Sequence, residues 1–124
     1  MPTYSDGILV PVVLFPRFTT LVGANIDFAT LPLEVSAYDQ EQITFWRGPL
    51  VNGLAMYVVV QESNDRDAWS TLDSFQVPQE EETPSVADLS RRWFRVVVRL
   101  SPSSVGVQAI VSCWAQGSFV RRRT

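Results

Sequence analysis

The stretch that decides the fold is Leu54-Ala-Met-Tyr-Val-Val-Val-Gln-Glu-Ser-Asn-Asp-Arg-Asp-Ala-Trp69. Its first nine residues, Leu54–Glu62, are mostly apolar and include three consecutive valines, which favours a central β-strand. We expect the even-numbered positions from Leu54 to Val60 to line the core. The Ser-Asn-Asp that follows is typical of a turn, because Ser63 and Asn64 bond their own backbone two residues on. Trp69 then begins the antiparallel return strand and is expected to cover the end of the core.

Short strand-like segments separated by turn residues surround this hairpin, a pattern typical of all-β sandwiches and barrels. The other predicted strands are Ile8–Phe15, Phe18–Val22, Ile26–Phe28, Leu33–Tyr38, Gln42–Arg47, Trp69–Val77, Trp93–Leu100, Val105–Trp114 and Ser118–Arg121. One helical turn is predicted at Pro84–Leu89, with Thr83 as its cap. The sequence therefore predicts an all-β fold, a single-domain antiparallel β-sandwich that is jelly-roll-like and has about eight strands.

The strand predicted at Trp93–Leu100 alternates most clearly. Phe94, Val96, Val98 and Leu100 are expected to face the core, with Trp93, Arg95, Val97 and Arg99 outside. A length of 124 residues indicates one domain. We expect an extended N-terminal arm at residues 1–7, the sandwich at 8–121 and a basic tail at 122–124. The N-terminus has no basic region or cleavage site of a signal peptide, which predicts synthesis in the cytoplasm.

The composition argues against most catalytic sites. The chain has no histidine, no lysine and one cysteine. These absences exclude histidine-based triads, histidine metal sites, Schiff-base lysines and the lysine of a phosphate-binding loop. We therefore expect no enzyme activity, no catalytic residues and no cofactor or metal, and we expect Cys113 to be an inert core thiol.

The charges are divided between the two parts of the chain. Residues 1–88 hold all 13 acidic residues and three of the ten arginines, a formal charge of −10. Residues 89–124 hold seven arginines and no acidic residue, a charge of +7. This asymmetry lets two surfaces attract one another, within one subunit or between copies. The densest acidic segment is Glu80–Glu82, and Asp88 lies nearby. These carboxylates are compatible with a catalytic acid–base pair or with a solvated loop.

The hairpin within residues 54–75 and the strands within 91–114 resemble those of discoidin-like and other jelly-roll sandwiches. They also resemble small β-sandwich virion proteins of tailed bacteriophages. In place of the glycine usual in that turn this chain has Arg66. The resemblance implies a structural protein of a virus particle, made in the host cytoplasm, that binds itself and other virion proteins. A head-decorating or head/tail accessory protein is the first hypothesis, and a discoidin-like carbohydrate-binding module is the alternative.

Candidate interface residues come from the exposed strand faces and the basic tail. An apolar strand face beside arginines is typical of protein contacts. The candidates are Tyr57, Val59, Trp93, Arg95, Val97, Arg99, Arg121, Arg122 and Arg123. No membrane partner is expected, and the net charge of −3 gives no case for nucleic acid.

Two further features leave alternatives open. Trp46, Trp69, Trp93 and Trp114 are compatible with core positions, a protein interface or a platform for sugar rings. Asn64, Asp65 and Asp67 have oxygen ligands suited to calcium, but they fall short of a full ligand set, so a solvated turn competes with a calcium site.

Overall fold

The computed structural model describes residues 7–122, which form nine strands and no helix. No membrane-spanning helix is therefore found in this part of the chain. The strands are β1 (Gly7–Gly23), β2 (Asp27–Ala29), β3 (Leu33–Glu34), β4 (Gln40–Val51), β5 (Gly53–Ser63), β6 (Ser70–Gln76), β7 (Thr83–Asp88), β8 (Trp93–Pro102) and β9 (Ala109–Arg122). Strand β1 begins at the last residue of the predicted arm, and β9 extends into the first residue of the predicted tail.

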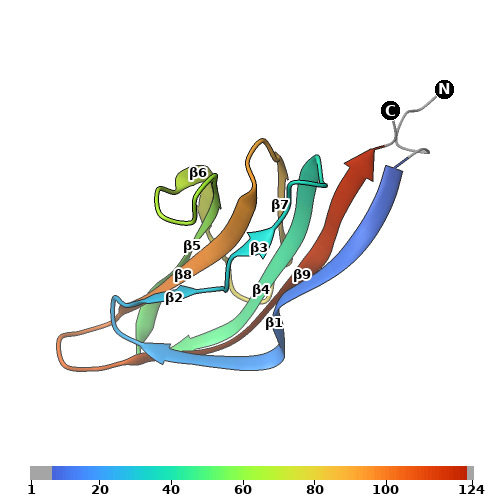
Figure 1. Cartoon of the computed structure of the whole chain (residues 1–124). Helices are drawn as coiled ribbons and strands as arrows, with labels where there is room; N and C mark the ends of the chain where they lie inside the picture. Colours follow the sequence, from blue (N-terminus) through green and yellow to red (C-terminus); the bar gives the residue numbers. More distant parts are fainter. Residues whose placement is uncertain (1–6, 123–124) are drawn as a thin grey trace.

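The strands form two antiparallel sheets that pack face to face (Figure 1). We call them sheet A, with the order β1-β9-β4-β7, and sheet B, with the order β2-β8-β5-β6. Strand β3 also pairs with β8, so β2 and β3 together occupy one position at the edge of sheet B. Counted in this way the fold has eight strand positions, and consecutive strands alternate between the two sheets except at the β5–β6 hairpin, as in a jelly roll. The predicted fold class is confirmed.

The core lies between the sheets and is built by the alternating positions of each strand. Phe94, Val96, Val98 and Leu100 of β8 are fully buried, as the sequence pattern predicts. From sheet A the core receives Ile43 and Phe45 of β4 and Phe119 of β9. Phe94 and Phe119 meet edge to face across the two sheets, with 5.3 Å between ring centroids. The two sheets thus share one core.

The helical turn predicted at Pro84–Leu89 is wrong, because this segment belongs to strand β7. Ser85 pairs with Ile43 and Val86 with Gln42 of β4. Strand β7 is at the edge of sheet A, where Pro84 is tolerated because one side of the strand has no partner to receive an N–H. Tertiary pairing therefore overrides the local helix signal.

Two predicted strand breaks are also absent. Strand β1 continues through Pro16, although its pairing with β9 shifts between Val13 and Thr19. Strand β9 continues through Gly117, where a Cβ atom would overlap the carbonyl oxygen of Gln42 on β4. The glycine thus permits a close approach of two strands. In the other direction, the predicted strand Leu33–Tyr38 shortens to β3, and Val105 lies in the loop before β9.

The predicted faces of β5 are correct except at its beginning. Met56, Val58 and Val60 are buried, but Leu54 is 71% exposed and Ala55 is buried in its place. The pairing of β5 with β8 shifts between Gly53 and Ala55, which turns Leu54 outward. A one-residue shift of this kind exchanges the two faces of a strand.

The turn after β5 forms as expected at Ser63, which bonds the backbone two residues on, but not at Asn64. The Ser63 hydroxyl oxygen accepts hydrogen bonds from the backbone N–H of Asp65 and Arg66. Asp65, rather than Asn64, is the second capping side chain, and its Oδ1 accepts from the N–H groups of Asp67 and Ala68. Arg66 adopts a left-handed φ of +64°, the conformation that glycine favours. The turn therefore accepts a non-glycine residue at this position without a change in its handedness.

Candidate functional site

The outer face of sheet B brings most of the predicted interface residues together. Tyr57 and Val59 of β5 lie opposite Arg99 and Val97 of β8 in the antiparallel register. With Arg95 they line a shallow groove of about 340 Å³. Tyr57 is 42% exposed. These five residues therefore form a continuous surface, while their role as an interface stays a prediction.

The arginines of this face already have partners within the chain. Arg95 donates through Nε to Gln61 at 2.7 Å, and its guanidinium lies 4.2 Å from the Trp69 ring centroid. Arg99 forms an ion pair with Asp27 of β2 at 2.8 Å, which raises the pKa of its guanidinium. Arg99 is thus neutralised by an acidic residue from earlier in the chain, whereas Arg95 has uncharged partners.

Trp93, at the start of β8, is covered in the same way. The guanidinium of Arg66 lies 4.5 Å from its ring centroid and that of Arg92 lies at 5.3 Å. Arg92 in turn forms an ion pair with Glu34 at 2.7 Å. Arg121, the predicted interface residue that precedes the basic tail, is exposed near the end of β9. Arg123 and the side chain of Arg122 lie outside the described part of the chain.

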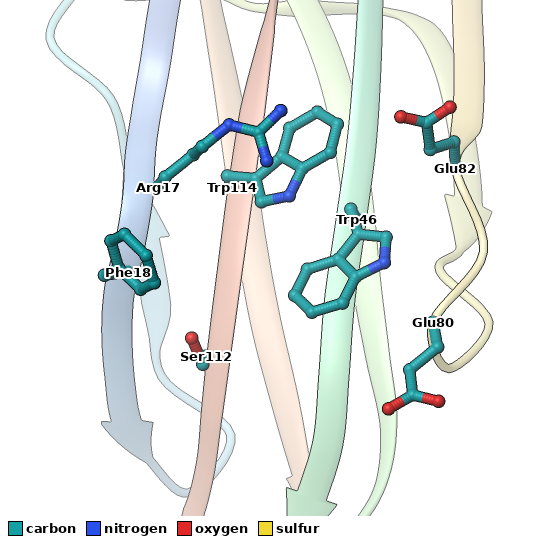
Figure 2. Close-up of a pocket in the computed structure, with 7 residues that line it drawn as sticks. All are labelled: Arg17, Phe18, Trp46, Glu80, Glu82, Ser112 and Trp114. Atoms are coloured by element: carbon teal, nitrogen blue, oxygen red, sulfur yellow. The ribbon is translucent and has the colours of Figure 1, made fainter.

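The outer face of sheet A carries the other two tryptophans, side by side. Trp46 of β4 is the register partner of Trp114 of β9, and both side chains project away from the core (Figure 2). Their rings are nearly parallel, with an interplanar angle of 11° and 6.3 Å between centroids. They form the floor of a groove of about 500 Å³. Sequence reasoning named both residues but did not pair them, because the pairing depends on the β4–β9 register.

Residues of opposite charge stand on the two sides of this groove (Figure 2). On one side Arg17, from the irregular part of β1, lies 4.7 Å from the Trp114 centroid, and Phe18 follows it. On the other side are Glu80 and Glu82, from the segment before β7. This acidic side is fixed to β4, since the N–H of Glu80 donates to the carbonyl of Arg47 at 2.7 Å.

A third surface, which sequence reasoning missed, lies at the end of the sandwich where β1 ends and the β8–β9 loop turns. In Figure 1 this end is at the lower left, away from the end of β9. Six large apolar side chains are exposed there: Val22, Ile26, Val51, Leu54, Val105 and Ile110. We call this surface the apolar end. The sequence contains the signal for it, because residues 18–26, 48–61 and 100–120 contain no charged residue.

The loops of the apolar end are held together by backbone hydrogen bonds. The N–H of Ser103 donates to the carbonyl of Asn52 at 2.8 Å, and the N–H of Asn25 donates to that of Leu100 at 2.9 Å. Asn25, Asn52 and Gly106 adopt left-handed backbone conformations that close their turns tightly. The exposed apolar side chains therefore stand on a defined framework.

The buried titratable groups offer no chemistry to a solvent-borne substrate. Cys113 is buried, and burial raises the pKa of its thiol to about 11, so it is protonated at neutral pH. Glu41 is also fully buried, inside the core side of β4. Asp65, in contrast, is exposed, and the N–H groups of Asp67 and Ala68 lower the pKa of its carboxyl by donating to Oδ1. Across residues 7–122 no group of three or more acidic or cysteine side chains is placed to hold a metal ion.

Comparisons with known proteins bear on the fold. No protein-family model and no curated protein matches the chain. Among solved structures, the PBSX exported protein XepA superimposes with a TM-score of 0.57 at 16% identity, over 88% of this chain. The match covers 37% of XepA, so this chain spans little more than a third of that protein's length. XepA supports the β-sandwich fold and assigns no function.

A second solved structure is the CBM36-1 domain of a multidomain xylanase from the hindgut metagenome of Trinervitermes trinervoides. The match covers 89% of this chain and 97% of that domain, at 10% identity and a TM-score of 0.46.

Proposed function

We propose that the protein is a non-enzymatic structural protein of a phage particle, a head-decorating or head/tail accessory protein that binds further copies of itself. The observation that carries this proposal is the apolar end. Exposed apolar side chains gathered on one surface mark contacts, since they gain free energy when they leave water. The phage setting is supported by the resemblance of residues 54–75 and 91–114 to small virion proteins. It also agrees with the origin of XepA in the phage PBSX.

The occupant of the apolar end, in this proposal, is the same end of a second copy. A surface without charges is matched by another surface without charges, because leaving a charge buried and unpaired costs about 3–5 kcal/mol. Both outer sheet faces of this chain carry charged side chains, and the apolar end carries none in residues 18–26, 48–54 or 100–110. A like-to-like contact of this kind is the usual arrangement of two-fold dimers. The sheet B face is the proposed surface for other virion proteins.

The test is the molar mass of the full chain in solution, by light scattering, over a range of concentrations. We expect a mass above the 13.9 kDa of one chain. Leu54→Asp and Val105→Asp place a charge in the apolar end at exposed positions, so they should return the protein to monomers without unfolding it. Val86→Asp, at an exposed valine of β7 outside the apolar end, is the matched control and should keep the wild-type mass.

Two results would overturn the proposal. The first is a monomer at every concentration, and the second is an oligomer that both apolar-end variants leave unchanged. Flotation with neutral phospholipid vesicles checks a different occupant. Wild-type protein that floats with vesicles, while Leu54→Asp does not, would assign the apolar end to a lipid surface instead.

A further inference from the structure

The irregular part of β1 holds an aromatic residue in a costly position. Phe18 has a φ of +68°, in the left-handed region that bulky side chains avoid. Its side chain is 90% exposed, so it contributes almost nothing to the core. The turn that presents it is closed by the Thr19 hydroxyl, which donates to the carbonyl of Pro16 at 2.6 Å. Strain at an exposed aromatic residue has no benefit for folding and is typical of a binding site.

Phe18 stands beside the tryptophan floor of the sheet A groove. Trp46 is partly exposed, whereas Trp114, nearly parallel to it, is only 7% exposed and lies beneath the Arg17 guanidinium. Trp46 therefore supplies the open apolar ring face of the groove. A second hollow of about 440 Å³ adjoins the first and shares Arg17, Glu82 and Trp114 with it. Together they make one elongated groove beside β1, with volumes in the range of ligand sites. The shape suits a chain-like ligand with flat apolar faces.

The polar groups of the groove determine the charge of that ligand. Arg17 stands on one side and Glu80 and Glu82 on the other. Within residues 7–122 the carboxylates of Glu80 and Glu82 form no hydrogen bond or ion pair. An anionic ligand is repelled by these two carboxylates, and a cationic ligand is repelled by Arg17, which already covers the Trp114 ring. A neutral ligand that donates and accepts hydrogen bonds satisfies both sides.

We propose that this groove binds a neutral carbohydrate chain. A sugar ring packs its C–H face on Trp46, its hydroxyls donate to the carboxylates of Glu80 and Glu82, and its oxygens accept from the guanidinium of Arg17. Phe18 covers the chain from the β1 side. This function goes beyond assembly through the apolar end and uses a different surface, so each can fail while the other stands.

The acidic side of the groove is built to stay in place, which favours binding. Arg47 donates through Nε to the carbonyl of Val77 at 2.7 Å and through Nη1 to that of Gly48 at 3.0 Å. Its own carbonyl receives the N–H of Glu80. The segment that bears the two glutamates is thereby tied to β4, next to Trp46. A ligand does not have to order this side of the groove when it binds.

The test titrates the full chain with three neutral hexasaccharides, xylohexaose, cellohexaose and maltohexaose. The readout is the NMR signal of each tryptophan indole N–H. We expect at least one hexasaccharide to shift the signals of Trp46 and Trp114. The signals of Trp69 and Trp93, which belong to the sheet B side, serve as internal controls and should not move.

Variants locate the site. Trp46→Ala removes the stacking surface and should weaken binding about tenfold, the value of one aromatic contact. Phe18→Ala should weaken it by a few fold, and this exposed residue can be removed without loss of the core. Tyr57→Ala, a half-exposed aromatic residue on the opposite sheet, is the matched control and should bind as the wild type does.

Four results would overturn the inference. They are the absence of any shift with all three hexasaccharides at millimolar concentration, equal shifts at all four tryptophans, wild-type binding by both Trp46→Ala and Phe18→Ala, and tighter binding of hexagalacturonate or hexaglucosamine than of every neutral chain. The last result would assign the groove to a charged ligand. The molar mass of the same samples shows whether assembly through the apolar end survives, so failure of the two proposals is distinguished.

Discussion

Each sheet buries one glutamate, and the two carboxyls have opposite surroundings. Glu62 of β5 has both oxygens occupied, because Oε1 accepts from the N–H groups of Ser90 and Arg91, and Oε2 accepts from the Ser90 hydroxyl at 2.9 Å. Glu41 of β4 has one partner, the Ser85 hydroxyl, 3.2 Å from Oε2. Its Oε1 is buried without a hydrogen bond in the described part of the chain.

The outer faces of the sheets repeat this difference. On sheet B, Arg95 and Arg99 are engaged by Gln61, Trp69 and Asp27. On sheet A, Glu80 and Glu82 point toward a groove (Figure 2). The two faces have similar residue types, and only the partners differ. Sheet B satisfies its polar groups within the chain, whereas sheet A leaves groups that a ligand or a proton can satisfy.

Phe94→Ala should have the largest effect on the free energy of unfolding, and it tests whether the two sheets unfold as one unit. Phe94 is fully buried and packs against Phe119 of the other sheet. Its truncation should lower the free energy of unfolding by about 3–5 kcal/mol. Chemical denaturation followed separately by the indole signals of Trp114 and Trp69 should give one shared transition. Two transitions would show that the sheets are independent and would break the comparison.

Glu62→Ala should have the next largest effect. It leaves the N–H groups of Ser90 and Arg91 without an acceptor at the β7–β8 turn, at a cost of about 2–3 kcal/mol. Urea denaturation measures this loss. Glu34→Ala is the matched control, since its carboxylate pairs with Arg92 on the surface and its loss should cost less than about 1 kcal/mol. Equal losses in the two variants would contradict the difference in burial.

Glu41→Gln tests the burial of the Glu41 carboxyl through the pH dependence of stability. Burial raises the pKa of Glu41 from 4.5 to about 8, so the folded protein holds a proton that the unfolded chain releases. This contribution to stability is therefore complete below pH 4.5 and is lost as the pH rises toward about 8, by up to about 1.4 kcal/mol per pH unit. Denaturation at pH 5, 6 and 7 should show this decline in the wild type relative to Glu41→Gln. A constant difference between the two proteins would exclude a buried neutral carboxyl.

Arg99→Ala should have the smallest effect. Its ion pair with Asp27 is about half exposed, and solvent screens pairs of this kind, so urea denaturation should show almost no change in the free energy of unfolding.

Salt gives a separate test for assembly. Because the apolar end has no charges, oligomers should persist at about 1 M salt, where the screening length is about 3 Å. Dissociation in salt would instead favour attraction between the acidic and basic parts of different copies.

The sequence predicts the framework of this protein well where local and tertiary patterns agree. The alternation in Trp93–Leu100 identifies the core face of β8 at every position, since that strand has no bulge. The prediction fails where pairing with a strand distant in the sequence determines the secondary structure. Pro84–Leu89 has the residues of a helical turn and becomes a strand because β4 lies beside it.

The candidate surfaces also differ in how far the sequence predicts them. The sheet B residues were predictable because one strand and its neighbour supply most of them. Trp46 and Trp114 are 68 positions apart, and their meeting depends on a register that the sequence does not reveal. The apolar end joins three separate loops, although its uncharged runs are visible in the sequence.

The irregular strand β1 also affects how copies of the chain avoid one another. It is 17 residues long and lies at the edge of sheet A, with β9 as its single neighbour in the sheet. A long regular edge is a template for fibril growth by strand addition. Here Pro11 and Pro16 each lack an N–H, and the ladder is interrupted between Val13 and Thr19. An incoming strand finds only short stretches to extend, so the edge that presents Phe18 also protects the protein against aggregation into cross-β fibres.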